Sequence, residues 1–431
     1  MAAANKPTEV TLRAYQVGFG DCFLLTFHYP ARGAKPAFQR HLLIDFGSTA
    51  KPKNAKGDIL LRVAEDIKTE CNGKLDAVIA THRHKDHISG FATKDGKGSG
   101  DIIRSLEPKI VLQPWTEDPK AAPDATKSLA VSSKKAFVAT LLDIHSFSES
   151  ALAEAARLKE RVGVRTSAQL AFLGDDNLAN RSAIDNLMAM GKNRYLNFGM
   201  KSGLERILPG VKVHVLGPPT IDQSAGIKKQ RARDEAEFWH LQALSGKHFM
   251  AKGQAPFPRA AKYPTIPPHA RWIVPRLRAI RRDQLLQIVR AMDQALNNTS
   301  IILLFEAGEK KLLFPGDAQI ENWSYALNDA PNKDAIRKLL AEVDFYKVGH
   351  HGSLNATPKT LWNLFKRRKD TASPTRLRSV VSTLSGKHGD SDNDTEVPRE
   401  KLVTALQLES DFFTTQELST AKLKEAFTIP L

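Results

Sequence analysis

The segment THRHKDHISG, residues 81–90, places three histidines and an aspartate within six positions. His82 and His84 lie one residue apart after the apolar run LDAVIA, and at the extended end of a strand such side chains point to the same side. Asp86 and His87 follow where a helix is expected to begin, so they project in other directions. This spacing suits two neighbouring divalent metal ions rather than one. Imidazole and carboxylate ligands favour zinc first, with manganese or iron as substitutes.

Three later segments carry residues of the same chemistry, and together they resemble a known family. THRHKDH resembles the HxHxDH signature of the metallo-β-lactamase superfamily. Asp45 in LLIDFGS, Asp317 in LLFPGDA and His350 in VGHHGS fall where that family places its other motifs, in the same order and strand context. The resemblance implies that Asp317 bridges two metals and that Asp45 orients the metal-binding loop. It implies these metal ligands: His82, His84, Asp86, His87, Asp317 and His350.

Longer stretches narrow the resemblance. VGFGDCFLL, NNTSIILLFEAGEKKLLFPGD and VDFYKVGHHGS are similar to the soluble hydrolase domain of the DNA-uptake competence proteins and to related phosphodiesterases. The competence proteins add a membrane channel, for which this sequence has no counterpart. The resemblance therefore implies a hydrolase and not a transporter.

One histidine of the superfamily pattern has no clear counterpart. The family often supplies it between HxHxDH and the bridging aspartate, where it completes the shell of the first metal. A first metal rich in water ligands, or a single-metal enzyme, therefore remains an alternative. None of the five histidines in this interval has the sequence context of a ligand: His145, His214, His240, His248 and His269.

The expected chemistry is hydrolysis by a metal-bound hydroxide. Two ions roughly 3.5–4 Å apart bind a bridging water and lower its pKa toward neutrality. In a phosphodiester they also neutralise charge on the non-bridging oxygens during in-line attack. Asp86 is expected to hold the second metal and orient the attacking water. His351 is expected to donate a proton to the leaving group, with support of the neighbouring ligands as the alternative role.

The runs around these motifs predict a mixed α/β fold. Short β-rich runs precede a helix-like stretch at residues 59–71, and SIILLFEAGEKKLLFPGDA predicts a β-hairpin in a second β-rich half. The resemblance implies a four-layer αββα sandwich with the metal cleft at one edge of two sheets, where the strand-end loops converge. The expected ligands, more than two hundred residues apart at the extremes, then meet in one cleft.

Two segments stand out within an expected single domain over residues 1–431. Residues 116–200 are rich in alanine, leucine and lysine at helical spacing, and they predict a helical insertion. Residues 221–282 interleave cations with aromatic rings, as a surface that tracks a nucleic-acid strand does. The alternative is a surface insertion whose aromatic residues anchor it to the core. The expected phosphate-binding residues are Lys228, Lys229, Arg231, Arg233, Arg276, Arg278, Arg281 and Arg282.

Bulk composition adds a statement about partners. The 431 residues include 63 Lys and Arg against 47 Asp and Glu, a formal net charge of +16. This charge favours a polyanion such as nucleic acid, although a basic surface also serves solubility alone. Two cysteines and the lack of a long apolar run predict a cytoplasmic chain with neither a disulfide framework nor a membrane span. Composition leaves the oligomeric state open.

The sequence thus predicts a metal-dependent hydrolase, first of all a phosphodiesterase or nuclease acting on DNA, RNA or another phosphodiester. One alternative is hydrolysis of a carbonyl substrate such as a lactone, thioester or β-lactam, in which the same hydroxide attacks carbon. Another is a non-catalytic protein that binds nucleic acid or a partner and keeps a structural metal site. Charge favours the first, because an uncharged small substrate gives no reason for the basic cluster at residues 221–282.

Overall fold

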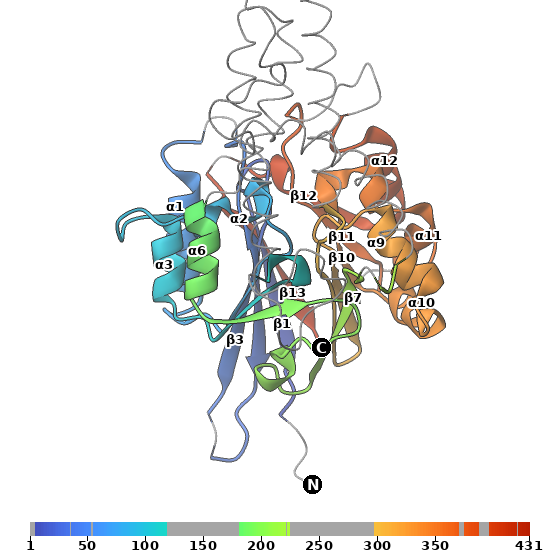
Figure 1. Cartoon of the computed structure of the whole chain (residues 1–431), viewed down its shortest axis with the longest axis horizontal. Coiled ribbons are helices and arrows are strands. Elements are labelled where there is room, and N and C mark those ends of the chain that lie inside the picture. Colours follow the sequence, from blue (N-terminus) through green and yellow to red (C-terminus); the bar gives the residue numbers. More distant parts are fainter. Residues whose placement is uncertain are drawn as a thin grey trace, which may run out of the picture.

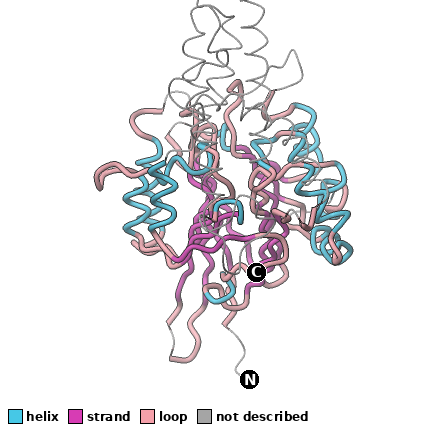
Figure 2. Tube along the Cα trace, in the orientation of Figure 1, coloured by secondary structure: helices cyan, strands magenta, loops and turns pink. Residues whose placement is uncertain are grey.

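The computed structural model describes nine stretches of the chain, namely residues 5–34, 36–52, 55–118, 181–220, 222–224, 297–369, 375–387, 396–419 and 421–431. Within these stretches the strands form two mixed sheets, one of seven strands and one of six. The strands occupy the middle of the molecule, and helices cover the outer side of each sheet (Figure 1, Figure 2). The prediction of a mixed α/β fold is therefore confirmed.

The first sheet has the strand order β13-β1-β2-β3-β4-β5-β6. Neighbouring strands are antiparallel from β13 to β3 and parallel from β3 to β6. The C-terminal strand pairs with the N-terminal one, so both ends of the described chain lie in one sheet. The strands are β1 (Glu9–Tyr15), β2 (Cys22–Tyr29), β3 (Phe38–Phe46), β4 (Ala77–Ile79), β5 (Ile110–Pro114), β6 (Lys192–Leu196) and β13 (Lys424–Pro430).

The second sheet has the order β12-β11-β10-β9-β8-β7. Strands β8 and β9 form the predicted antiparallel hairpin, and β9 to β12 are parallel neighbours. The strands are β7 (Val211–Gly217), β8 (Ile302–Ala307), β9 (Lys310–Phe314), β10 (Phe345–Lys347), β11 (Arg378–Val381) and β12 (Asp411–Thr414).

Helix α1 (Ile59–Glu70) shows how local sequence sets these elements. The carboxylate of Asp58 accepts hydrogen bonds from the N–H groups of Leu60 and Leu61, which caps the helix. Its buried residues, Ile59, Val63, Ala64 and Ile67, recur at the spacing of one helix face. The other helices are α2 (Lys85–Ile88), α3 (Ser99–Ser105), α6 (Arg181–Ala189), α9 (Ile320–Ser324), α10 (Lys333–Ala341), α11 (Lys359–Trp362) and α12 (Glu400–Glu409).

Short helical turns, mostly of the 3₁₀ type, join these elements. They are η1 (Ser89–Phe91), η2 (Trp115–Glu117), η3 (Leu204–Arg206), η5 (Tyr325–Asp329, a π-helix), η6 (His350–Gly352), η7 (Leu354–Ala356), η8 (Lys366–Lys369) and η10 (Thr415–Glu417). None of the helices in the described stretches is long and apolar enough to cross a membrane.

Apolar side chains fill three spaces, and strand alternation explains why. On β3, Leu42 and Ile44 pack between the two sheets, whereas Leu43 packs on the other face against α1. Residues of the second sheet such as Leu303 and Phe314 complete the middle space. The outer face of that sheet packs against α9 to α12. Because both faces of both sheets are covered, the loops at the strand ends are held in place from two sides.

Both predicted insertions fall largely outside the described residues. Of the expected helical insertion, residues 119–180 are not described, and residues 181–200 carry α6 and β6. Strand β6 pairs with β5, so this end of the segment contributes to the first sheet. Of the basic segment at residues 221–282, the structure describes residues 222–224. All eight expected phosphate-binding residues therefore lie outside the described part.

Candidate metal centre

Among the described residues, histidines and aspartates meet in three overlapping buried groups, one of which consists of Asp21, Asp45 and His87. Asp86, His87, Asp317 and His351 offer ligand atoms that all lie within 4.8 Å of one another. A second group with the same spacing shares Asp86 and adds two residues, His82 and His84. The shared aspartate places the groups side by side. These residues follow β4 in the first sheet and β9 and β10 in the second, so the centre depends on how the two sheets pack.

The four-residue group has the donors of a cation site. His87 Nε2 lies 3.1 Å from Asp317 Oδ2, and neither atom has a hydrogen-bond partner although both are buried. His351 Nε2 lies 2.8 Å from Asp86 Oδ2 and 3.8 Å from Asp317 Oδ2. Buried polar atoms normally have a hydrogen-bond partner, so the two unpartnered atoms of His87 and Asp317 indicate a binding site for a further group. A divalent cation between imidazole nitrogens and carboxylate oxygens satisfies them all.

The second group supplies two imidazoles and one carboxylate. His82 Nε2 lies 3.0 Å from His84 Nδ1, and the ring of His82 also lies 4.1 Å from that of His87, centroid to centroid. Among the described residues, the histidine missing from the motif pattern is not found in this group. Of its candidates His214 alone is described, and it lies on β7 beside Glu306, to which it is paired at 3.4 Å. This position agrees with the expectation that His214 is not a metal ligand.

Asp45 is hydrogen-bonded to the loop that carries the HxHxDH motif. It is the last residue but one of β3, and its carboxylate accepts hydrogen bonds from the N–H of Thr81 (2.7 Å) and from its hydroxyl (2.7 Å). It also lies 2.8 Å from His87 Nδ1. A carboxylate can only accept, so Nδ1 carries a hydrogen, and Nε2 is the ring nitrogen that faces the cluster and would bind a metal ion.

The loop after β3 lies directly against α2, and this needs a glycine. A Cβ atom on Gly47 would lie 2.6 Å from backbone atoms of Lys85, Asp86 and His87. The N–H of Asp21 donates to the carbonyl of Asp86 at 3.0 Å, and the N–H of Gly47 donates to the carbonyl of Asp21 at 3.1 Å. Backbone contacts thus fix α2 before any side chain binds a metal.

The structure changes the assignment of the paired histidines. His350, His351 and Gly352 have successive φ values of +46°, +52° and +91°, an uncommon run of left-handed conformations. This turn buries the ring of His351 completely, and its Nδ1 bonds to the carbonyl of Ser382 at 2.8 Å. The ring of His350 is 26 % exposed, with Nε2 3.9 Å from Asp317 Oδ2. His351, expected as a proton donor, is therefore in the ligand group, and His350, expected as a ligand, lies at its margin.

Two further residues of the centre were missed by the motif analysis. Lys347, the last residue of β10, is buried and forms an ion pair with Asp21, which is fully buried. Lys347 Nζ also lies 3.6 Å from Asp317 Oδ1. The signals in the sequence were a charged residue inside each of two apolar stretches, VGFGDCFLL and VDFYKVGHH. Buried charges in such positions are rare unless they are paired.

The charges of the centre favour a bound cation. Four carboxylates, those of Asp21, Asp45, Asp86 and Asp317, are buried together. Burial alone lowers the pKa of His87, but these carboxylates, Asp317 and Asp86 first, raise that pKa well above its ordinary value. For His82, burial lowers the pKa well below its ordinary value, and His87 and His84 lower it further. Negative charge is thus in excess around His87, where a divalent ion is the natural counter-charge.

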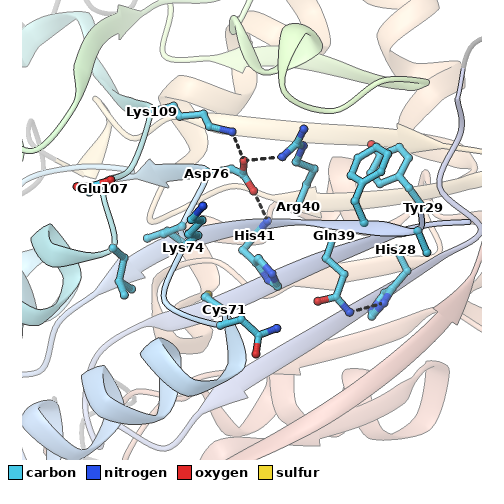
Figure 3. Close-up of a pocket in the computed structure, with 15 residues that line it drawn as sticks. His28, Tyr29, Gln39, Arg40, His41, Cys71, Lys74, Asp76, Glu107 and Lys109 are labelled. Carbon is cyan, nitrogen blue, oxygen red and sulfur yellow. Dashed lines mark hydrogen bonds and ion pairs between the residues drawn. The ribbon is translucent and has the colours of Figure 1, made fainter. Parts of the chain in front are cut away.

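A separate pocket of about 630 Å³ lies away from this centre. It is lined by residues at the start of β3 and just before β4 and β5, whereas the metal ligands follow the other end of β4. Asp76 there accepts hydrogen bonds from Lys109 Nζ (2.8 Å), an Arg40 guanidinium nitrogen (3.2 Å) and the N–H of His41 (2.9 Å), as Figure 3 shows. The carboxylate at the centre of this pocket is therefore already paired. Through these bonds Asp76 links the parallel strands β3, β4 and β5.

In comparisons with known proteins, this chain matches no protein-family model and no curated protein. The geometry of the buried centre therefore carries the functional argument.

Proposed function

We propose that this protein is a metal-dependent hydrolase of the metallo-β-lactamase superfamily, with the αββα sandwich of that family, and that it cleaves phosphodiesters. The observation that carries the proposal is the pair of adjacent buried ligand groups that share Asp86. A hydrolytic site with two metal ions needs a carboxylate that both ions can share. Asp317 is a second candidate for this role, because its Oδ2 lies within 4 Å of imidazole nitrogens of His87, His350 and His351.

The residues divide into roles by position. His82 and His84 would hold one ion, and His87 and His351 the other, with Asp86 and Asp317 between them. Zinc is the first candidate for both ions and manganese the second, because the donors are nitrogens and carboxylate oxygens without sulfur. When bound, the ions supply an activated water and neutralise charge on the group that is cleaved. His350, partly exposed beside Asp317, takes the proton-donor role that the sequence analysis gave to His351.

The choice of a phosphodiester rests on charge. The chain carries a formal net charge of +16, which attracts a polyanion, so DNA or RNA is the first candidate substrate. A lactone, thioester or β-lactam remains the second candidate within enzymes, since the same centre can attack carbon. A protein that only binds nucleic acid would keep the metal for structure.

The test begins with metal analysis of the purified protein. The protein is then incubated with single- and double-stranded DNA, RNA, bis(p-nitrophenyl) phosphate and a chromogenic β-lactam. We expect cleavage of phosphodiesters, abolished in Asp317→Asn and retained in His214→Ala, a control whose side chain lies on β7 outside the centre. Cleavage of the β-lactam alone would reassign the substrate. Nucleic-acid binding that survives in Asp317→Asn, with no turnover by the wild type, would establish the binding-protein alternative.

A further inference from the structure

Lys347 is an unusual residue for the interior of a protein. Its side chain is 2 % exposed, and its ammonium group forms an ion pair with Asp21. The same Nζ donates a hydrogen bond to the carbonyl of Gly316 at 3.3 Å and lies 3.6 Å from Asp317 Oδ1. An ammonium group is buried at a large cost unless it is paired, so these contacts explain how the lysine is tolerated. They also place a positive charge beside a carboxylate of the proposed metal centre.

The two oxygens of Asp317 have different surroundings. Oδ1 accepts a hydrogen bond from the backbone N–H of His350 at 3.1 Å and faces Lys347. Oδ2 has no hydrogen-bond partner, and it lies 3.1 Å from His87 Nε2 and 3.8 Å from His351 Nε2. The chain therefore holds one oxygen and leaves the other to the ligand group.

Asp21 contacts the same centre on the side of the histidine rings that faces away from Asp317. Its Oδ2 lies 3.6 Å from His87 Nδ1, and its Oδ1 lies 3.7 Å from His351 Nδ1. Both contacts are to the ring nitrogen opposite the one that faces Asp317. Asp21 is also fully buried, and its backbone N–H donates to the carbonyl of Asp86. Asp21 thus contacts three of the four residues in the larger ligand group, two through its carboxylate and Asp86 through its backbone.

We propose that Asp21 and Lys347 form a positioning pair that makes Asp317 present a single oxygen, Oδ2, to the metal ions. Lys347 holds Oδ1 away from the ions, and Asp21 cancels the charge that this lysine would otherwise bring to a cation site. The inference rests on the proposed function, because it takes the cluster to be a divalent-metal centre. It adds two residues that the ligand motifs do not contain, Asp21 from the loop between β1 and β2 and Lys347 from β10.

The charges predict opposite effects for the two halves of the pair. In Asp21→Asn, an uncompensated ammonium group remains 3.6 Å from Asp317 and repels divalent cations. In Lys347→Met, no ammonium group is left to repel a cation. Asp317 Oδ1 has lost its positively charged neighbour, so Asp317 can turn and bind through both oxygens. In the double variant Asp21→Asn/Lys347→Met, both charges are removed together, and the net charge of the centre is that of the wild type. A pair that serves only to stabilise the fold has no reason to show this pattern.

The experiment is a double-mutant cycle read out by cobalt(II) binding and not by activity. Titration of the metal-free protein gives the affinity, and the visible absorption spectrum reports the coordination of the ion. We expect Asp21→Asn to weaken cobalt(II) binding by about tenfold or more, the range for residues that orient metal ligands. We expect the double variant to recover an affinity close to that of the wild type, and Lys347→Met to bind with an altered spectrum.

A matched control is Lys310→Met, which breaks the ion pair between Lys310 and Asp344 (3.1 Å) at the opposite end of β9. It should leave affinity and spectrum unchanged. Circular dichroism of each metal-free variant separates loss of folding from loss of binding, and the charge-neutral double variant keeps the test open if a single variant does not fold.

The possible results separate the two proposals. Wild-type protein that binds no cobalt(II) or zinc(II) contradicts the proposed function itself. Wild-type binding with equal losses in Asp21→Asn and in the double variant, or with no loss in either, contradicts the positioning pair alone. A wild-type spectrum in Lys347→Met contradicts the single-oxygen role of Asp317.

Discussion

His351 and Asp86 lie 265 positions apart in the sequence, and His351 Nε2 lies 2.8 Å from Asp86 Oδ2. Asp86 belongs to α2, which follows a strand of the first sheet, and His351 follows a strand of the second. Their contact therefore joins the two halves of the fold at the candidate metal centre. It also gives a direct way to distinguish the two adjacent histidines.

His351→Ala should weaken binding of the second ion, because the ring is fully buried within the ligand group. The loss should exceed the roughly 10- to 100-fold effect of removing a residue that only orients a ligand. His350→Ala should retain both ions, since that ring lies at the margin. Metal content after dialysis and titration with zinc(II) measure both variants. Loss of an ion in His350→Ala but not in His351→Ala would restore the assignment made from the sequence.

Asp45→Asn should lower metal affinity while the protein stays folded. The asparagine amide group can donate to His87 Nδ1, which would move the ring hydrogen to Nε2, the nitrogen that faces the cluster. The expected loss is roughly 10- to 100-fold, measured by competition with a zinc chelator. Asp76→Asn changes a buried carboxylate before the start of β4 and serves as the control. Equal affinities in the two variants would show that Asp45 does not orient the ligand.

Removal of metal should destabilise the fold. Without a cation, four buried carboxylates are left with Lys347 and protonated histidines as their counter-charges. A metal at about a thousand times its Kd contributes about 4 kcal/mol to the free energy of unfolding. We expect a chelator to lower the melting temperature and added zinc or manganese to restore it. The chelator should have little effect on Asp317→Asn, and an identical melting temperature for treated and untreated wild type would contradict a bound metal.

His41 should make the fold sensitive to acid, independently of any metal. Burial lowers the pKa of His41 from its ordinary value of 6.5 to about 4, with Asp76 acting in the opposite direction. As pH falls from 6.5 to 4, the unfolded chain takes up this proton and the folded protein does not. Stability is therefore full above pH 6.5 and decreases through this window, by at most about 3 kcal/mol.

Denaturation by urea at pH 7.5 and pH 4.5 measures this effect. His41→Gln should lose less stability between the two pH values than the wild type does. His28→Gln changes a partly exposed histidine on the adjacent strand, and burial lowers the pKa of His28 as well, so this variant should show the same effect to a smaller extent. An acid-induced loss that is the same in His41→Gln as in the wild type would exclude His41 as its source.

Much of the centre could be predicted because its signals are local. His82, His84, Asp86 and His87 lie within six residues, so their ligand chemistry and spacing are properties of one loop. Asp45 and Asp317 each end an apolar run that predicts a strand, so both were expected where the strand-end loops meet. The hairpin of β8 and β9 and the helix α1 follow equally from turn residues, capping and the period of apolar positions.

Other features were decided by tertiary structure alone. The choice between His350 and His351 depends on three left-handed residues in a row, a backbone path that the letters HHG do not specify. Asp21 and Lys347 meet because the two sheets pack face to face, and neither residue has a neighbour in sequence that reveals its partner. Sequence spacing determines which ligand types are available, since it acts through local backbone geometry. Which buried charges face one another is determined by long-range packing, where burial makes each unpaired charge costly.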